Sequence, residues 1–319
     1  MVIIIGSGPI GLATAIELKR RGIESTIIER GCLVNSIYNY PVNMTFFSTS
    51  ERLEIGDIPF ISHGPKPTRK EALEYYRRAA EHYELNVKLY EEVREVNGED
   101  GRFEVITSKG SYSADKVVLA TGFYGQANPM KVPGEDLPKV MHYYDEPHRY
   151  AWQNVLVVGG GNSAVDVALE TWRCNANVTM VVKYSELKAS VKYWVKPDIE
   201  NRIEEGAIKA HFNSEVLEIR SGEVDIRTAE GEVTIPNDFV LAMTGYRPHF
   251  GLMKKLGIEL TDDDVQMPVY SEQTLETNRE GLYVAGVVCG GMDTSRLFIE
   301  NTRIHAEHIA EDIGKKLKS

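Results

Sequence analysis

Two glycine-rich turns, about 150 residues apart, each follow a short apolar run and constrain the fold more than any other feature of the chain. Gly6-Ser7-Gly8-Pro9-Ile10-Gly11 comes directly after Val2-Ile3-Ile4-Ile5, and Gly159-Gly160-Gly161-Asn162-Ser163-Ala164 comes directly after Val155-Leu156-Val157-Val158. A strand, a G-x-G-x-x-G/A turn and a helix in that order form a dinucleotide-binding unit. Two such units in one chain predict that two dinucleotides meet, as where a nicotinamide reduces a flavin.

Each glycine of the first turn has an expected role. Gly6 permits the tight turn after the strand, Gly8 lets the backbone approach a pyrophosphate, and Gly11 allows the following helix to pack on the strand. We expect that helix over Leu12–Arg21, with Gly22 as its C-terminal breaker. Its first N–H groups and the positive end of its dipole would face the phosphates.

The next expected strand, Ser25–Glu29, ends in an acid 18 residues after Gly11. A carboxylate at that place accepts a ribose 2′-hydroxyl, which is compatible with FAD or NAD. The N-terminal position favours FAD, whereas the alternative is a tight turn that binds nothing. The residues expected to bind FAD are Gly6, Gly8, Pro9, Ile10, Gly11, Glu29, Arg30, Ser48, Val93, Ala120, Thr121, Gly122, Gly286, Ser295 and Arg296.

Two later segments support a flavin site. Lys116–Gly122 reads as an apolar strand that ends in Ala-Thr-Gly, and Gly281–Gly286 reads as another short strand that ends on glycine. A helical stretch is expected from about Thr294 to Leu317. If it starts near Thr294 or Ser295, its N-terminal dipole would stabilise the anionic reduced flavin by about 1 kcal/mol.

The second turn is followed by an expected helix over 162–172 and a strand over 177–182. Lys183, not an acid, follows that strand, and Lys188 and Lys192 come next. A basic cluster accommodates a 2′-phosphate, so we expect NADPH; the alternative is an ordinary solvated loop. The residues expected to bind NADPH are Gly159, Gly161, Asn162, Ser163, Ala164, Lys183, Lys188, Thr244, Gly245 and Tyr246.

The halves share a further pattern. Alternating apolar and polar residues with turn signals predict an antiparallel meander over 215–240, and similar signals occur over 102–119. We therefore predict an α/β fold of two Rossmann-like, three-layer ββα domains. Residues 1–124 and 249–319 would form the FAD-binding domain, and residues 125–248 an inserted NADPH-binding domain.

Composition narrows the function classes. The 319 residues carry a net charge of -11, which disfavours nucleic acid and anionic membranes as partners. No apolar run approaches the roughly 20 residues that span a bilayer, and no signal peptide is evident, so we expect a cytoplasmic protein. Cys32, Cys174 and Cys289 lie outside Cys-x-x-Cys spacing, so we expect no metal site and mostly packing roles.

By these motifs the chain resembles the thioredoxin-reductase-like flavoproteins over essentially its full length. Their redox dithiol is absent, because the matching stretch reads His142-Tyr143-Tyr144-Asp145-Glu146-Pro147. A narrower resemblance is to the bacillithiol disulfide reductase family, and it is carried by residues 35–41, 45–51, 53–57, 285–287 and 298–301. That resemblance implies that NADPH and FAD reduce the disulfide of a low-molecular-weight thiol, alongside bacilliredoxins, and by analogy that the protein is a homodimer.

One departure from that family concerns the catalytic thiol. Many members carry a cysteine in the first glycine turn, where this chain has Ile10. Either the flavin reduces the disulfide directly, or Cys32 or Cys289 serves as the thiol, or the acceptor is different. The candidate catalytic residues are Ser48 and Thr49 beside the flavin, His142 as a proton donor to a leaving thiolate, and Cys289. Arg296 is a candidate to hold a substrate carboxylate.

Three other functions use the same pair of dinucleotide sites. A flavin monooxygenase also lacks the dithiol, although its Phe-x-Gly-x3-His-x3-Trp/Tyr signature is not found here. A ferredoxin or flavodoxin reductase of this fold usually carries a C-terminal extension over the flavin. A non-catalytic nucleotide sensor would hold a flavin that NADPH cannot reduce.

Overall fold

The computed structural model describes residues 1–318, and the chain divides into two compact units. Met1–Gln126 and the segment from Tyr246 onward form one, here called the discontinuous unit, and Ala127–Gly245 form the inserted unit. These limits lie within three residues of the domain boundaries expected from the sequence. What each unit binds stays a prediction. No helix among residues 1–318 is long and apolar enough to cross a membrane.

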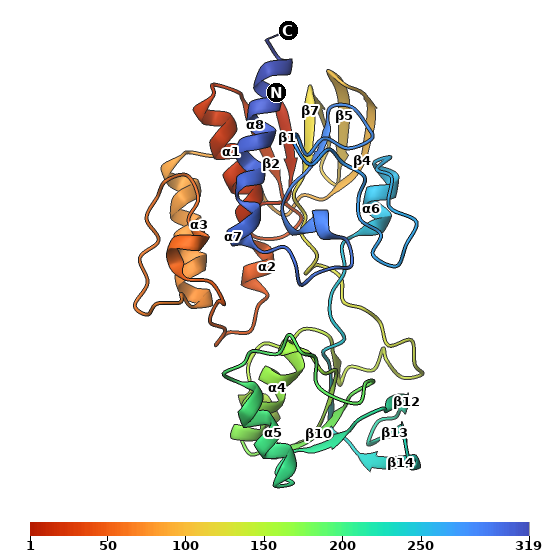
Figure 1. Cartoon of the computed structure of the whole chain (residues 1–319). Coiled ribbons are helices and arrows are strands. Elements are labelled where there is room, and N and C mark those ends of the chain that lie inside the picture. Colours follow the sequence, from red (N-terminus) through yellow and green to blue (C-terminus); the bar gives the residue numbers. More distant parts are fainter. Residues whose placement is uncertain (319) are drawn as a thin grey trace. The chain divides into compact units, whose positions relative to one another are not determined.

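A five-stranded parallel sheet is the centre of the discontinuous unit (Figure 1). Its strands, in spatial order, are β16 (Leu282–Val284), β7 (Lys116–Leu119), β1 (Val2–Ile5), β2 (Ser25–Ile28) and β3 (Val87–Lys88). One face is covered by α1 (Pro9–Arg20), α3 (Arg69–His82) and α8 (Ile304–Lys316). The other is covered by the meander β4 (Val93–Glu99), β5 (Arg102–Thr107), β6 (Ser111–Ala114) and by α6 (Phe250–Lys255).

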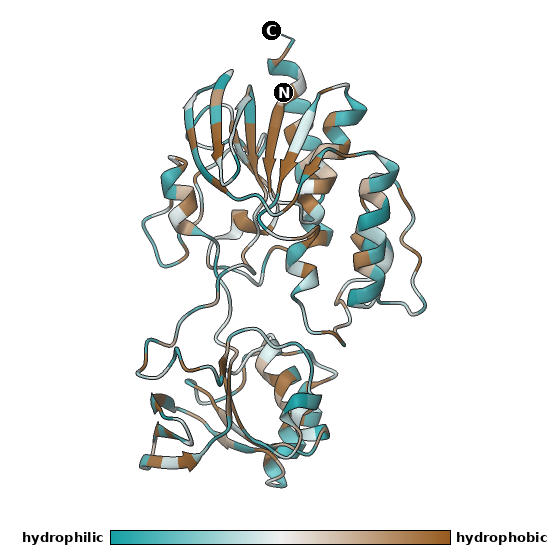
Figure 2. Ribbon diagram, turned by 180° about the vertical axis from the view of Figure 1, so that it is seen from behind, coloured by the Kyte–Doolittle hydropathy of each residue, from teal (hydrophilic) through white to brown (hydrophobic). Residues whose placement is uncertain are grey.

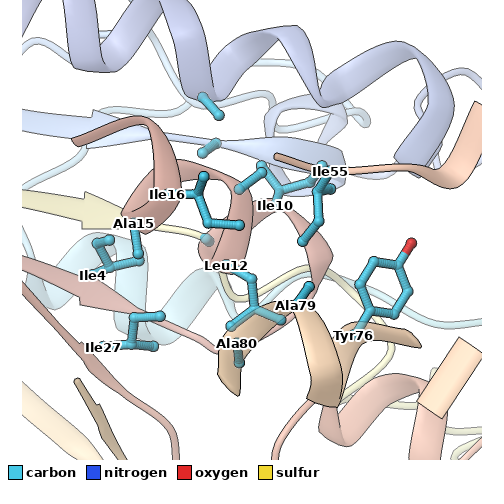
Figure 3. Close-up of a cluster of buried hydrophobic side chains, with 14 of the residues drawn as sticks. Ile4, Ile10, Leu12, Ala15, Ile16, Ile27, Ile55, Tyr76, Ala79 and Ala80 are labelled. Atoms are coloured by element: carbon cyan, nitrogen blue, oxygen red, sulfur yellow. The ribbon is translucent and has the colours of Figure 1, made fainter. Parts of the chain in front are cut away.

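The alternation of side chains along β1 explains these three layers. Successive residues of a strand point to opposite faces, so an apolar run of four can serve two cores. Val2 and Ile4 pack with the helices, whereas Ile3 and Ile5 pack with the meander. Figure 3 shows the helix-side core, where Ile4 and Ile27 from the sheet lie near Leu12 and Ala15 of α1.

The inserted unit repeats this plan. Its parallel sheet has the order β11 (Lys209–His211), β10 (Asn177–Val181), β9 (Asn154–Val158), β15 (Phe239–Ala242) and β8 (Val140–Met141). Helices α4 (Asn162–Arg173) and α5 (Lys196–Glu204) share one core with the sheet. The core on the other face of the sheet is formed with a meander, made of β12 (Glu215–Ile219), β13 (Glu223–Thr228) and β14 (Gly231–Pro236). Figure 2 shows hydrophobic residues concentrated in the parallel strands. The predicted α/β class is confirmed.

Some expected element limits are wrong. The first helix begins at Pro9 rather than Leu12, because proline is well suited to the first helical position and Gly8 is the N-cap. The last helical stretch does not begin at Thr294 or Ser295: it starts with the single turn α7 (Ile299–Thr302), and α8 follows. The Asp293 carboxylate accepts a 3.0 Å hydrogen bond from the Ser295 hydroxyl, which favours a turn over a helix. The proposed dipole at Thr294–Ser295 is therefore absent.

Candidate functional site

The first glycine turn joins β1 to α1 and has one open side. Gly6 has φ +108°, and a Cβ there would lie 2.6 Å from the carbonyl oxygen of Ala120. A Cβ on Gly11 would lie 2.0 Å from the carbonyl oxygen of Gly6, whereas a Cβ on Gly8 would meet nothing within 4 Å. Gly6 and Gly11 thus permit close packing, and Gly8 leaves space at the helix N-terminus that suits a phosphate.

Glu29 is held beside this turn. Its side chain is buried, and its Oε2 accepts hydrogen bonds from the Ser7 N–H at 2.9 Å and the Ser7 hydroxyl at 3.2 Å. Its Oε1 accepts one from the Gly31 N–H at 2.8 Å. The carboxylate therefore has a fixed position directly after β2, and its Oε1 retains capacity to accept a bond from a ribose hydroxyl.

A cavity of about 360 Å³ opens next to this carboxylate. Six residues expected to bind FAD line it: Gly6, Glu29, Arg30, Val93, Thr121 and Gly122. The Thr121 hydroxyl oxygen is buried and has no hydrogen-bond partner among the described residues. A buried hydroxyl without a hydrogen-bond partner costs free energy unless a ligand supplies the missing partner. The open Gly8, the fixed Glu29 carboxylate and this hydroxyl fit the phosphates and ribose of a dinucleotide.

The other wall of the cavity comes from a segment that the sequence analysis missed. The chain enters the discontinuous unit again at Tyr246, and the next residues and α6 contribute Arg247, His249, Leu252 and Lys255 to the lining. His249 is the N-cap of α6, and its Nδ1 accepts a 3.0 Å hydrogen bond from the Leu252 N–H. Nδ1 therefore carries no proton, so Nε2 is the N–H donor of the ring. No local motif marks these residues, because only the chain crossing brings them to the cavity.

Cys289 lies in a sealed environment. It is fully buried in the meander-side core, and its Sγ is 3.9 Å from Nδ1 of His305, which also accepts the Gly286 N–H at 3.1 Å. Burial raises the pKa of the Cys289 thiol and lowers the pKa of His305 to about 4. Disulfide exchange needs an accessible thiolate. This burial therefore argues against the prediction that Cys289 is catalytic and favours a packing role.

Ile10, in the first turn of α1, lies against Gly286, two residues after β16. A Cβ on Gly286, which has φ +83°, would lie 3.1 Å from Cγ1 of Ile10. Ile10 is itself buried, so an aliphatic side chain fills the place that carries a cysteine in many proteins of the family resembled. Pro9 and Ala120, also expected to bind FAD, are both buried, at the start of α1 and directly after β7 respectively.

The remaining candidates of the discontinuous unit lie in irregular segments. Ser48 and Thr49 are half-buried and precede a short 3-10 helix over Ser50–Leu53. Arg303 binds that segment to the start of α8 by donating to the carbonyl oxygens of Glu51 at 3.0 Å and Glu54 at 3.2 Å. Ser48 and Thr49 thus stay candidates for contact with a flavin.

A helical stretch from about Thr294 would have Arg296 in its first turn, but Arg296 lies in the turn before α7. Its guanidinium is exposed, and its Nε lies 4.0 Å from Asp293 Oδ2. Ser295 is also exposed and donates to the same carboxylate. Neither residue lines the cavity beside Glu29.

The second glycine turn joins β9 to α4 with the same close packing. Gly159 has φ +136°, and a Cβ there would lie 2.5 Å from the carbonyl oxygen of Met243. A Cβ on Gly161 would be in ordinary contact, 3.7 Å from Cδ of Lys188. Ala164 is buried against the sheet and Ser163 is exposed. Lys183 and Lys188 are exposed after β10, where the carboxyl ends of the parallel strands lie.

The chain passes from one unit to the other after Gln126 and after Gly245, and the expected site residues in this part of the sequence are divided between the two units. In the inserted unit the Thr244 hydroxyl donates to the Asn128 carbonyl at 2.6 Å, and the Gly245 carbonyl accepts the Asn128 N–H at 2.9 Å. Tyr246 belongs to the discontinuous unit, where its ring centroid is 4.2 Å from that of Tyr124. His142 belongs to the inserted unit, and its Nε2 is 3.3 Å from Glu135 Oε1.

Comparison with known proteins agrees with this geometry. The family model described as pyridine nucleotide-disulphide oxidoreductase matches residues 3–286. Bacilliredoxin reductase Bdr of Bacillus subtilis (strain 168) is 46% identical over 98% of this chain and 97% of its own length. The solved bacillithiol disulfide reductase Bdr (YpdA) from Staphylococcus aureus is 43% identical, with a TM-score of 0.95 over 99% of this chain and 98% of that chain.

A more distant solved structure bears on the fold alone. The thioredoxin reductase of T. acidophilum is 20% identical, with a TM-score of 0.78 over 100% of this chain and 98% of that chain. The two-unit architecture is therefore of the thioredoxin-reductase type, and the resemblance inferred from the sequence is confirmed. The chain belongs to the pyridine nucleotide-disulphide oxidoreductase family and is a flavin disulfide reductase within it.

Proposed function

We propose that this protein uses NADPH and FAD to reduce the disulfide of a low-molecular-weight thiol of the bacillithiol type. The observation that carries the proposal is the presence, in one chain, of two glycine turns at the carboxyl ends of two parallel sheets. The name of the Staphylococcus aureus relative indicates the substrate class. The balanced reaction is NADPH + H⁺ + RSSR → NADP⁺ + 2 RSH.

The discontinuous unit is the proposed FAD site. The first turns of α1 would bind the pyrophosphate, Glu29 would accept the ribose hydroxyls, and Thr121 and His249 would offer further hydrogen bonds at the cavity wall. A bound flavin supplies the two-electron chemistry, and the protein supplies position and electrostatics.

The inserted unit is the proposed NADPH site. Backbone N–H groups of the turn Gly159–Ala164 and of the N-terminus of α4 would bind the pyrophosphate, and Lys183 and Lys188 would pair with the 2′-phosphate.

The environments of Cys32 and Cys289 shape the proposed mechanism. Burial raises the pKa of Cys32 as well as that of Cys289, and the Sγ of Cys32 donates to Asn35 Oδ1 at 3.5 Å. Neither is a good nucleophile. We therefore expect no mixed disulfide between these cysteines and the substrate.

The cellular setting follows by analogy. We propose a cytoplasmic homodimer that supplies electrons to a bacilliredoxin-type system through the reduced thiol. The Bacillus subtilis relative carries bacilliredoxin reductase in its name, which supports this partner class. Sedimentation of the purified protein would give the oligomeric state.

An acceptor panel tests the function. The holoenzyme is given NADPH under anaerobic conditions with bacillithiol disulfide, glutathione disulfide, or ferredoxin, and in a separate arm with oxygen. We expect the fastest NADPH oxidation with bacillithiol disulfide, with two thiols released per NADPH. Faster reduction of ferredoxin, or oxygen-dependent insertion into a substrate, would assign the protein to one of the other flavoprotein classes.

A further inference from the structure

The loop that carries the two proposed phosphate-binding lysines is hydrogen-bonded to the second glycine turn. This lysine loop, residues 183–195, follows β10 and is mostly exposed. The Lys188 N–H donates a 2.9 Å hydrogen bond to the carbonyl oxygen of Gly160. The carbonyl of Lys188 then accepts the Val191 N–H at 3.0 Å, so a tight turn follows. Lys188 is thus fixed at its backbone beside the turn that binds the dinucleotide.

Asn162 provides two more bonds of this kind. Its Nδ2 donates to the Ser190 carbonyl at 2.9 Å, and its Oδ1 accepts the Lys192 N–H at 2.9 Å. Asn162 is the first residue of α4, so the helix fixes its own position. One side chain therefore closes the loop onto the helix N-terminus through both ends of its amide.

The charges of the loop are not equivalent. The Lys192 ammonium lies 2.6 Å from Asp166 Oδ2, one helical turn beyond Asn162, so a carboxylate already compensates it. Lys188 has no carboxylate within 4.0 Å among residues 1–318, and its aliphatic chain passes beside Gly161. Lys188 is therefore the cation next to the turn whose charge is left for a ligand.

We propose that Asn162 is a positioning residue for the 2′-phosphate of NADPH and acts through Lys188. This inference rests on the proposed use of NADPH. A lysine on a free loop loses backbone and rotamer freedom when it binds a phosphate, and a loop fixed beforehand does not incur that cost again. The two amide bonds of Asn162 hold the lysine loop in place before the nucleotide arrives.

The test compares two nucleotides in the Asn162→Ala holoenzyme. Michaelis constants are measured for NADPH and NADH with a saturating disulfide. Dissociation constants for adenosine 2′,5′-bisphosphate and 5′-AMP are measured by calorimetry. We expect KM for NADPH and Kd for the bisphosphate to rise about tenfold, the effect of about one hydrogen bond. We expect kcat, KM for NADH and Kd for 5′-AMP to change less than twofold, because alanine keeps the backbone N–H groups that are proposed to bind the pyrophosphate.

A double variant and a control make the result specific. In a Lys188→Ala background the Asn162→Ala change should alter KM for NADPH by less than twofold, because both changes remove the same interaction. Asn201→Ala, an exposed substitution on α5, controls for the replacement of an asparagine. If thermal unfolding shows that Asn162→Ala is unfolded, Asn162→Ser carries the test, since its shorter side chain cannot reach both partners.

Two outcomes would overturn the inference. Equal losses for NADPH and NADH would mean that Asn162 supports the turn for any dinucleotide. Additive losses in the double variant would mean that it does not act through Lys188. A wild-type enzyme that does not prefer NADPH over NADH would instead refute the proposed cofactor, so the two failures are distinguishable.

Discussion

The open side of Gly8 gives a direct way to separate flavin binding from folding. Gly8 has φ -65°, which alanine adopts without strain, and a Cβ there would meet nothing within 4 Å of protein. Alanine is a poorer helix N-cap than glycine, so we expect Gly8→Ala to lower the free energy of unfolding of the apoprotein by at most about 1 kcal/mol. The new methyl group would, however, occupy space that a pyrophosphate needs.

The size of the effect on FAD follows from the bonds at stake. Displacing the pyrophosphate from the N-terminus of α1 would remove at least one hydrogen bond between a backbone N–H and a charged oxygen. Such a bond contributes about 1.5–3 kcal/mol, which corresponds to a roughly 10- to 150-fold weaker Kd for FAD. The Kd is measured by titration of the apoprotein with FAD, followed by flavin fluorescence.

Gly6→Ala is the matched control in the same turn. Gly6 has φ +108°, and an alanine Cβ would lie 2.6 Å from the Ala120 carbonyl oxygen. We expect this variant to lose stability by at least about 1–3 kcal/mol from backbone strain alone. Thermal unfolding should therefore shift for Gly6→Ala and hardly at all for Gly8→Ala. A Gly8→Ala protein that bound FAD as tightly as wild type would refute the assignment of this turn to the pyrophosphate.

Three further predictions use residues with defined environments. Cys289→Ala should keep at least half of the wild-type turnover, and Cys289 in the native enzyme should resist iodoacetamide, because burial raises the pKa of the thiol and keeps it neutral. Peptide mass spectrometry after labelling would detect a modified Cys289 if this is wrong. Asparagine in His249→Asn can still cap α6, but its side chain is a shorter donor, so the affinity for FAD should fall with little change in stability, whereas His249→Ala should also lose about 1 kcal/mol of unfolding free energy. If His249→Asn binds FAD as tightly as wild type, the role of His249 is only to cap the helix. Lys183→Glu should raise KM for NADPH far more than KM for NADH, and an equal rise for both would show that Lys183 does not contact the 2′-phosphate.

The parallel sheets and both glycine turns could be predicted from the sequence because their signals are local. An apolar run such as Val2–Ile5 that is bounded by glycine has few alternatives to a buried parallel strand. The alternating pattern over 215–240 likewise has the period of a half-buried meander, and β12, β13 and β14 form there.

Features set by distant parts of the chain or by side-chain bonds could not be predicted. Arg247 and His249 line the cavity beside Glu29 only because the chain returns to its first unit after about 120 residues. The predicted start of the last helical stretch is wrong because Asp293 holds Ser295 in a turn through a side-chain hydrogen bond. Helix propensity takes no account of such a bond. The sealed environment of Cys289 depends on packing around β16 and α8.

The central claim is that electrons pass from a nicotinamide to a flavin held by the same chain. The most direct measurement is anaerobic stopped-flow absorbance of the oxidised protein mixed with NADPH. We predict that one equivalent of NADPH bleaches the visible flavin absorbance and that bacillithiol disulfide then restores it. A purified protein that takes up no flavin, or whose flavin is bleached by dithionite but not by NADPH, would contradict the account.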